Sequence, residues 1–409
     1  MKLKDIAEYV SEKISSDSID LDCYVTTDSL LQNKAGRELA TNLPPQVCTL
    51  TRFHKGDILI GNIRPYLKKI WMADIDGGCN ADVLVIRAKN GHSPNFLYAL
   101  LLQDTFYQYA MKGAKGSKMP RGDKDQIMRY EVPTLSSTEE SIGKFIVDIR
   151  DKIALNREIN RNLEAMARQL YDYWFVQFDF PDENGKPYKS SGGKMVWNER
   201  LKREIPDGWK DVDLKEYLKC ISERIQVSER DGYIYTPIEV LPRKQMSFSD
   251  YAPIEEATSG LCKYRESDIL LSNRRVYFHK VCIAPSDGIT RDTVIVLRSQ
   301  ADLLGYSFQL VFSDHFISYA TQHSYGSEQP VLSWEAAKKY KVLKPSLNLD
   351  YKYSSISNNI ISQIISNERE IREMVKYRDE LLPLLMNGQV SVMPTAVNCD
   401  LFGYQQKFY

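Results

Sequence analysis

Two stretches of the chain carry apolar residues in a seven-residue repeat. In the first stretch, one row of the repeat consists of Ile142, Ile149, Asn156 and Leu163, beside a second row at positions 145, 152, 159 and 166. In the other stretch, one row consists of Ile364, Ile371, Arg378 and Leu385, beside positions 360, 367, 374 and 381. Apolar heptads with an occasional polar member are typical of a coiled coil of specified register. We therefore predict long helices over residues 138–175 and 348–388 that pack on each other, the alternative being that each packs on its own domain.

The region before each long helix has the pattern of an α+β domain. The opening residues place Ile6, Val10 and Ile14 four positions apart, which predicts a helix. Short apolar runs at residues 57–63 and 83–88, and again at 268–274 and 294–299, predict buried β-strands. Asp-Gly pairs at 76–77 and 287–288 predict turns between strands. The predicted fold class is α+β with two long helices.

These two α+β regions are copies of one another. With a shift of 211 positions the sequence matches itself without gaps from residue 3 to residue 87, and residues 57–87 share 13 identities in 31 positions with residues 268–298. Such a repeat indicates a duplicated domain. The predicted organisation is a first domain at 1–137, a long helix at 138–175, a linker rich in Pro, Gly and Ser at 176–207, a second domain at 208–347, a second long helix at 348–388 and a C-terminal tail at 389–409.

Composition agrees with two ordinary globular domains and narrows the class of protein. The 409 residues are enough for two cores. There are 54 basic and 54 acidic side chains, so the chain is neutral and any basic surface must be local. No apolar run is long enough to span a bilayer, and the seven cysteines are widely spaced without a Cys-x-x-Cys pair. We expect a cytoplasmic protein with reduced thiols, no metal site and no membrane association.

The order of domain, heptad helix, linker, domain and heptad helix resembles the DNA specificity subunits of type I restriction-modification systems. Two motifs add to this resemblance: KIALNREINRNLEAMARQLYDYWF at residues 152–175, and IPDGW at 205–209, just before the second copy begins. The resemblance covers nearly the whole chain. It implies two target recognition domains, each of which reads one half of a split, asymmetric site in double-stranded DNA. It also implies an antiparallel coiled coil that sets the distance between them.

The same resemblance implies the partners and assigns the chemistry to them. Two methyltransferase (modification) subunits would dock on the helices, and restriction/translocase subunits would complete the complex. S-adenosylmethionine, ATP and Mg²⁺ would be bound by those subunits, and this chain would bind no cofactor. The sequence agrees, since it contains neither a P-loop GxxxxGK[ST] nor the Asn/Asp-Pro-Pro-aromatic motif of a methyltransferase. We expect a non-catalytic chain.

Three pairs of segments are candidates for contact with DNA. The first is the turn at residues 62–69 and its copy at 273–280, called here the shared turn. Its candidate residues are Asn62, Arg64, Tyr66, Lys68, Lys69, Asn273, Arg274, Arg275, Tyr277 and Lys280. Asn and Arg can bind base edges, whereas Lys and Tyr suit phosphates. Because both copies keep these residue types, we expect contacts to the DNA backbone, with a purely structural role as the alternative.

The second pair is the glycine loop at residues 112–124, with its copy at 323–331. Its candidate residues are Lys112, Lys115, Ser117, Lys118, Arg121 and Lys124. Glycines let backbone amides approach phosphate, and the cations release counterions when they bind. The copy has no lysine and carries Glu328, so we expect the second domain to use Arg243, Lys244 and Arg274 instead.

The third pair is the divergent loop, residues 32–37 and 243–245, where the copies differ. Base reading is predicted here, because residues that read different bases must themselves differ. Two other functions stay open at this point: a specificity subunit of another restriction class, and a two-domain coiled-coil adaptor that binds no DNA. Neighbouring genes would separate the first from a type I subunit. The second predicts that the basic residues of the glycine loop can be neutralised without effect.

Overall fold

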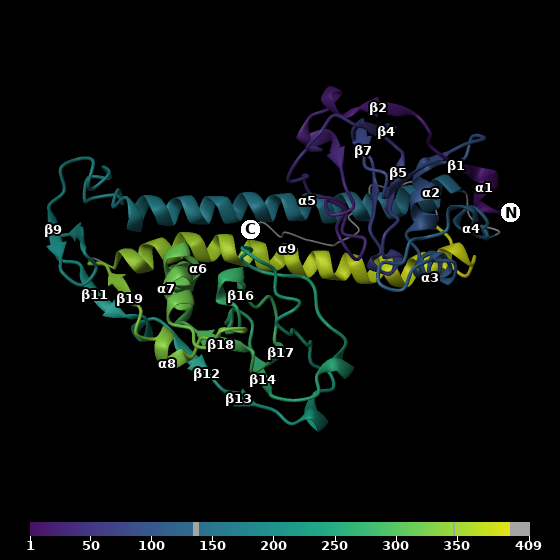
Figure 1. The fold of residues 1–409 in the computed structure, drawn as a ribbon. Helices are drawn as coiled ribbons and strands as arrows, with labels where there is room; N and C mark the ends of the chain where they lie inside the picture. The colour runs from purple at the N-terminus through teal and green to yellow at the C-terminus, as the bar shows by residue number, and fades with distance from the viewer. Residues whose placement is uncertain (134–138, 347, 393–409) are drawn as a thin grey trace, which may run out of the picture. The chain divides into compact units, whose positions relative to one another are not determined.

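The computed structural model describes residues 1–133, 139–346 and 348–392. Helices and sheets are mixed along the chain, and two helices are much longer than the rest (Figure 1). The chain divides into two compact units. Of the described residues, unit 1 contains 1–152 and 375–392, and unit 2 contains 153–374. The predicted domain boundaries at 137 and 347, and the tail from residue 393 onward, lie outside the described residues.

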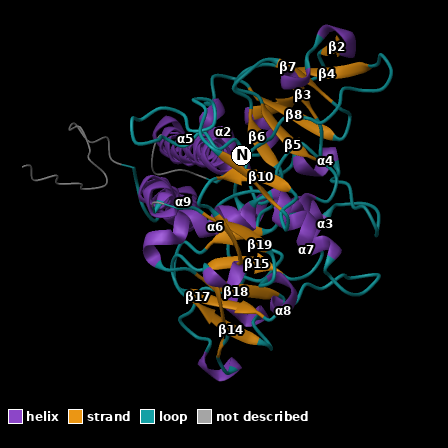
Figure 2. Ribbon diagram, turned by 90° about the vertical axis from the view of Figure 1, so that its left-hand side faces the viewer, coloured by secondary structure: helices purple, strands orange, loops and turns teal. Residues whose placement is uncertain are grey.

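Unit 1 is built on two four-stranded sheets. One has the strand order β1-β8-β5-β6 and the other has the order β2-β4-β7-β3. The strands are β1 Ala7–Tyr9, β2 Lys13–Ser15, β3 Tyr24–Val25, β4 Thr49–Phe53, β5 Ile58–Gly61, β6 Ile70–Met72, β7 Gly77–Cys79 and β8 Val83–Ala88. The short helices are α1 Leu3–Ile6, α2 Pro94–Leu101, α3 Asp104–Lys112 and α4 Lys124–Ile127. Helix α2 packs on β5 and β8 (Figure 2).

Unit 2 repeats the first of these sheets with the order β12-β18-β15-β16, repeats three strands of the second as β13-β14-β17, and adds the two-stranded sheets β10-β9 and β11-β19. The strands are β9 Met195–Asn198, β10 Arg203–Pro206, β11 Lys210–Asp213, β12 Lys219–Ile221, β13 Glu223–Arg224, β14 Leu261–Tyr264, β15 Ile269–Ser272, β16 Val281–Ile283, β17 Gly288–Arg291, β18 Val294–Arg298 and β19 Lys341–Lys344. The short helices are α6 Leu304–Phe312, α7 Asp314–Gln322 and α8 Trp334–Ala337. Strand for strand, the repeated sheet matches the sequence duplication.

Burial on both faces explains why the central strands read as continuous apolar runs. In unit 1, Ile58, Ile60 and Ile86 lie in one core cluster, while the alternate residues Leu59 and Val85 lie in another. The equivalent strands of unit 2 divide between two clusters in the same way. A strand covered on both sides has no polar face, so its sequence does not alternate.

A buried ion pair occupies the same place in both repeated sheets. Asp57 is 2% exposed and accepts two hydrogen bonds from the Arg87 guanidinium, at 2.7 and 2.8 Å. Arg87 also pairs with Glu12 at 2.6 Å. Asp268 and Arg298 repeat the two bonds at 2.7 Å in unit 2. Because a buried carboxylate is tolerated only when it is paired, this contact accounts for the identity of these positions in the two copies.

The prediction of a helix at the start of each copy is wrong. Only Leu3–Ile6 is helical, and the chain then enters β1, which pairs antiparallel with β8. In the second copy a 3-10 turn, Leu214–Glu216, leads into β12, which pairs with β18. Apolar residues four apart suit a helix locally. Pairing with a strand some eighty positions later outweighs that local pattern, since the strand completes the sheet.

Residues 176–207, predicted to be a linker, are folded as part of unit 2. Strands β9 and β10 form an antiparallel pair within this segment. Phe178 and Phe180 are buried, and the Phe180 ring stacks on Trp209 with 5.2 Å between ring centres. The content of Gly, Pro and Ser predicts a loop. The segment nevertheless packs on unit 2, because its aromatic side chains are buried in the core of that unit.

The long helices are α5, Glu139–Tyr171, and α9, Leu349–Met386. A π-helical segment, Asp172–Val176, follows α5. Within unit 2 the two helices run antiparallel (Figure 1). A ladder of polar side chains joins them. Its bonds run from Asn156 to Glu370 at 2.6 Å, from Asn160 to Glu368 at 2.7 Å and from Asn367 to Asn160 at 2.7 Å. A buried polar ladder of this kind favours one register over others.

The residues predicted for the helix seam are largely buried. Ile142, Asn156, Ile364, Ile371, Arg378 and Leu385 are buried, and Ile149 and Leu163 are half-buried. The predicted second row of α5 is displaced by one residue. Its buried members are Ile146, Ile153, Asn160 and Ala167. Ile159 and Met166, which had suggested the other row, are 37% and 56% exposed, so apolar surface residues misled the assignment.

Glu164 of α5 is a half-buried carboxyl whose charge is disfavoured. Burial raises the pKa of Glu164 to about 7, a hydrogen bond from the backbone amide of Met246 acts against this rise, and the nearby charge of Glu368 adds to it. The carboxyl therefore holds a proton more tightly in the folded chain than in the unfolded chain.

We expect the free energy of unfolding to fall as pH rises, by about 2 kcal/mol between pH 5 and pH 8 from this group. The sign follows from a folded pKa above the ordinary value of 4.5: the contribution is complete below that value and is lost as pH rises through about 7. The variant E164Q cannot ionise and should lack this component. Urea unfolding of both proteins across this pH range measures it, and parallel pH profiles would contradict the raised pKa.

Candidate nucleic-acid interface

The shared turn has the same backbone conformation in both copies. A 3-10 turn lies between Arg64 and Lys68, which both have left-handed backbone angles, with φ of 52° and 51°. Arg275 and His279 flank the equivalent turn with φ of 49° and 54°. Left-handed backbone at a non-glycine residue costs roughly 1 kcal/mol. Strain of this kind is kept where surrounding contacts impose it, and it is concentrated at functional sites.

The glycine loop is hydrogen-bonded to the shared turn in both units. The Arg64 backbone N–H donates to the Pro120 carbonyl at 2.7 Å. The Arg275 N–H donates to the Pro330 carbonyl at 2.9 Å in the second copy. Two segments that are far apart in sequence therefore form one surface in each unit.

The divergent loop joins the same surface. In unit 1 the Lys34 N–H donates to the Lys68 carbonyl at 2.9 Å, and in unit 2 the Lys244 N–H donates to the His279 carbonyl at 3.0 Å. All three candidate segments thus meet in each unit, with the shared turn in contact with the other two. The shared turn, which is the same in both copies, therefore supports the divergent loop, which differs between them.

In unit 1 the exposed cations lie on the glycine loop. Lys112, Lys115, Ser117, Lys118, Arg121 and Lys124 are all exposed. The side chain of Lys115 is 84% exposed although its ammonium lies 3.0 Å from Asp123, and Arg121 is 59% exposed while it pairs with Asp82 at 2.9 Å. Tyr66, in the shared turn, is also exposed. Exposed ion pairs are weak, so these cations can exchange their partners for phosphates.

Unit 2 carries different exposed groups on the same backbone framework. Arg243, Lys244, Arg274, Arg275 and Tyr277 are exposed. The Arg243 guanidinium lies 4.0 Å from the centre of the Phe278 ring, and Arg274 donates to the side-chain carbonyl of Gln329 at 3.1 Å. Tyr325, at the position that Lys115 has in the first copy, is 65% exposed. The exposed positive charge of unit 2 therefore lies on the shared turn and the divergent loop, whereas that of unit 1 lies on the glycine loop.

Lys69 and Lys280 have a structural role in place of the predicted phosphate contact. Lys69 is buried, and its ammonium donates to the backbone carbonyl of Thr27 at 2.5 Å. The Lys280 ammonium donates to the carbonyl of Ile238 at 2.7 Å. Each lysine thus connects the shared turn to the chain that precedes the divergent loop. A lysine alone in sequence does not reveal whether its ammonium meets solvent or a carbonyl.

Asn62 and Asn273 likewise point inward, as in the structural alternative to the expected contact with the DNA backbone. The Asn273 side-chain amide donates to the backbone carbonyl of Asp292 at 2.8 Å. The Oδ1 atoms of Asn62 and Asn273 are buried, with no hydrogen-bond partner among the described residues.

The sequence prediction missed one aspartate in each copy. Asp104 pairs with Lys34 at 2.8 Å and with Lys68 at 3.0 Å. Asp314 occupies the same place beside Lys244 and His279, at 3.7 and 3.3 Å. Burial opposes ionisation of Asp104, yet its bonds to both lysines lower its pKa. Comparing the copies at a shift of 210 would have matched the two aspartates.

The chemistry that this surface supports is binding. Its exposed ammonium, guanidinium and hydroxyl groups are those that bind phosphates and base edges. Among residues 1–133, 139–346 and 348–392, no cluster of His, Cys, Asp and Glu could hold a metal ion. In the same part of the chain, no helix combines the length and apolar character needed to cross a membrane.

Comparison with known proteins gives a consistent set of relatives. No protein-family model matches the chain. The type I restriction enzyme MjaIX specificity subunit of Methanocaldococcus jannaschii is 23% identical over 370 residues, which cover 87% of this chain and 83% of that protein. The type I restriction enzyme HindI specificity subunit of Haemophilus influenzae is 30% identical over 194 residues, which cover 43% of this chain and 40% of that protein.

A solved structure shares the fold. The crystal structure of a type I restriction-modification system S subunit from M. genitalium matches 94% of this chain and 95% of its own, with a TM-score of 0.56 and 14% sequence identity. At this identity the likeness concerns architecture alone.

Proposed function

We propose that this chain, a relative of the specificity subunits of type I restriction enzymes, is itself the sequence-reading subunit of such a complex. It binds a split, asymmetric site in double-stranded DNA and directs methyltransferase and restriction subunits to it. Segments 1–137 and 208–347 act as tandem target recognition domains, and α5 and α9 act as an antiparallel coiled coil that sets the distance between the two half-sites. The chain is not an enzyme in this proposal.

One observation carries the proposal: the same three-segment surface occurs once in each unit, with a shared backbone and different exposed residues. The left-handed turn flanked by Arg64 in unit 1 recurs at Arg275 in unit 2, and each turn is bonded to a divergent loop and to a glycine loop. Two domains that recognise different DNA sequences need a shared backbone framework with different exposed residues. A common framework holds the DNA backbone while the variable parts discriminate bases.

The contacts to DNA divide by the chemistry of the exposed groups. In unit 1 the five basic residues of the glycine loop bind phosphates, since they are exposed and flanked by glycine. In unit 2 Arg243, Lys244, Arg274 and Arg275 take over this role, with Tyr277 beside them in sequence. Base reading belongs to the divergent loops, where the two units differ.

The long helices serve as spacer and as docking surface. Helix α5 has 33 residues, which makes it about 50 Å long, and one turn of B-form DNA is about 34–36 Å. A spacer of this length fits half-sites separated by bases that are not read. Two methyltransferase subunits dock on the helices, and these and the restriction/translocase subunits bind S-adenosylmethionine, ATP and Mg²⁺.

Exchange of one recognition domain tests the proposal. Replacing residues 1–137 with the corresponding segment of another specificity subunit should change only one half of the methylated sequence, because unit 2 keeps its own exposed residues. Sequencing of methylated DNA from cells that express the hybrid with the modification subunit measures this. A change in both halves would show that the units do not read separately.

A further inference from the structure

The divergent loop of unit 2 leads into a segment that α5 contacts. The backbone N–H of Met246, directly after that loop, donates to the Glu164 carboxylate of α5 at 2.7 Å. The Ser247 hydroxyl donates to the Ile283 carbonyl at 2.9 Å, which joins the segment to β16. Met246 is buried, so water does not replace the bond to Glu164 when that bond is lost.

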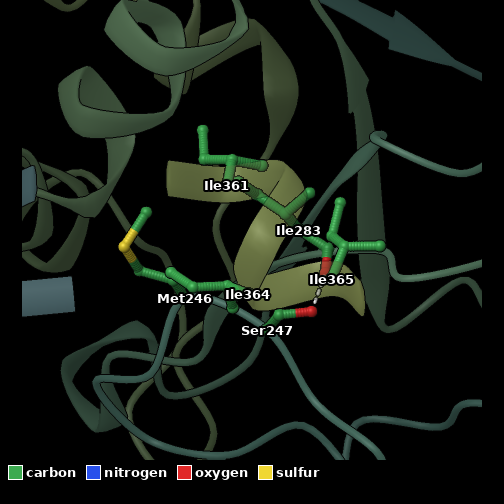
Figure 3. Close-up of a pocket in the computed structure, with 6 residues that line it drawn as sticks. All are labelled: Met246, Ser247, Ile283, Ile361, Ile364 and Ile365. Atoms are coloured by element: carbon green, nitrogen blue, oxygen red, sulfur yellow. Dashed lines mark hydrogen bonds between the residues drawn. The ribbon is translucent and has the colours of Figure 1, made fainter. Parts of the chain in front are cut away.

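Helix α9 contacts the same segment (Figure 3). Three isoleucines of α9 line a small pocket with residues that follow the divergent loop or belong to β16: Ile361, Ile364, Ile365, Met246, Ser247 and Ile283. One turn further along α9, Glu368 accepts a hydrogen bond from Ser249. The chain that leaves the divergent loop is therefore held by both long helices, through polar bonds and an apolar contact.

Unit 1 has a contact of the same kind between its divergent loop and a long helix. The Lys34 side chain is 6% exposed, and its ammonium lies 3.4 Å from the Asp379 carboxylate of α9. Lys34 has a positive φ of 63°, so the loop takes a conformation that an isolated chain avoids. Its ion pairs with Asp379 and Asp104 favour that conformation.

In both units the carboxylate that holds the loop comes from the other half of the sequence. Helix α5 follows the first copy, yet its Glu164 contacts the loop of the second copy. Helix α9 follows the second copy, yet its Asp379 contacts the loop of the first. Segments 1–137 and 208–347 therefore do not themselves contain the helix carboxylate that contacts their divergent loop.

We propose that Glu164 and Asp379 are positioning residues for base reading. Glu164 sets the conformation of the divergent loop in unit 2, and Asp379 sets that of unit 1, so each controls sequence discrimination in one half-site. This inference rests on the proposed function of the chain as a DNA specificity subunit.

The effect should fall on discrimination more than on affinity. Hydrogen bonds that tell one base from another require groups placed within about 0.5 Å of their ideal positions. A loop without its carboxylate contact samples more conformations, and correct and incorrect bases are then bound more equally. The phosphate contacts of the glycine loop in unit 1, and of Arg274 and Arg275 in unit 2, do not involve either carboxylate, so most of the binding persists.

The test uses the complete methyltransferase complex and a DNA library in which each position of the target is varied in turn. E164A should reduce the preference for the correct base by about tenfold in the half-site of unit 2, the smaller end of what one specific base contact provides. The other half-site should change less than threefold. D379A should give the reverse pattern. E164Q should stay within threefold of the parent protein, because its amide oxygen accepts the same N–H bond.

Exposed glutamates on the same two helices provide matched controls. E158A on α5 and E380A on α9 should change neither half-site. The positioning role would be overturned if E164A or D379A reduced the preference for the correct base equally in both half-sites, or if the control variants reduced it as much. It would also be overturned if neither E164A nor D379A reduced that preference. If thermal unfolding shows that E164A does not fold, D379A alone decides, since Asp379 is 44% exposed. A parent complex that methylates no split sequence would instead reject the proposed function.

Discussion

Replacement of Lys112, Lys115, Lys118, Arg121 and Lys124 by glutamine is expected to weaken DNA binding by the methyltransferase complex a hundred- to a thousandfold at physiological salt. Each phosphate contact releases counterions and adds about 0.9 to the slope of log K against log salt concentration. If all five side chains bind phosphate, that slope should fall by about 4. Binding titrations over a range of salt concentrations measure both quantities.

A variant with the same change in charge elsewhere provides the control. Lys186, Lys189, Lys194, Lys202 and Lys210 are exposed residues of unit 2 outside the candidate interface. Their replacement by glutamine should leave the salt slope nearly unchanged. Equal effects of the two variants would mean that the glycine loop acts only through net charge. No effect of the glycine-loop variant would favour an adaptor that binds no DNA.

Asp57→Ala and Asp268→Ala are each expected to lower the free energy of unfolding by about 3 kcal/mol. Each change leaves an arginine without the carboxylate that accepts two of its hydrogen bonds inside a sheet. The arginines are 32% and 29% exposed, so part of the lost interaction is recovered from water. Denaturant unfolding measures the change.

Exposed aspartates in each unit serve for comparison with these buried ones. Asp20→Ala in unit 1 and Asp302→Ala in unit 2 should stay within about 0.5 kcal/mol of the parent protein, as is usual for surface substitutions. If the Asp57 and Asp268 variants were as stable as these controls, the repeated ion pair would not account for the identity of the two copies.

Much of the architecture follows from the duplication, because a repeat places the same apolar runs in the same strands. Both long helices were predictable from heptads, since burial along one stripe recurs over several turns. The second row of α5 was not, because Ile159 and Met166 are apolar yet exposed, and composition does not distinguish a seam from a surface. The prediction for the opening segments was wrong for a different reason, because the strand with which each of them pairs is distant in sequence.

The candidate site was predictable as segments but not as individual roles. Residues of the shared turn stood out because two diverged copies keep them. Whether such a residue binds DNA or holds the fold depends on the direction of its side chain, which tertiary contacts decide. Lys69 and Lys280 are turned to backbone carbonyls, whereas Arg275 is exposed. The contact of Glu164 with Met246 joins residues 82 positions apart, and no local sequence pattern predicts it.

The most direct test of the central claim is to sequence the methylated DNA of cells that express this chain with its modification subunit. The proposed function predicts N6-methyladenine at a split, asymmetric sequence, and loss of that methylation when the chain is deleted. Absence of any such sequence, with the modification subunit soluble and active, would contradict the claim and leave only the shared fold.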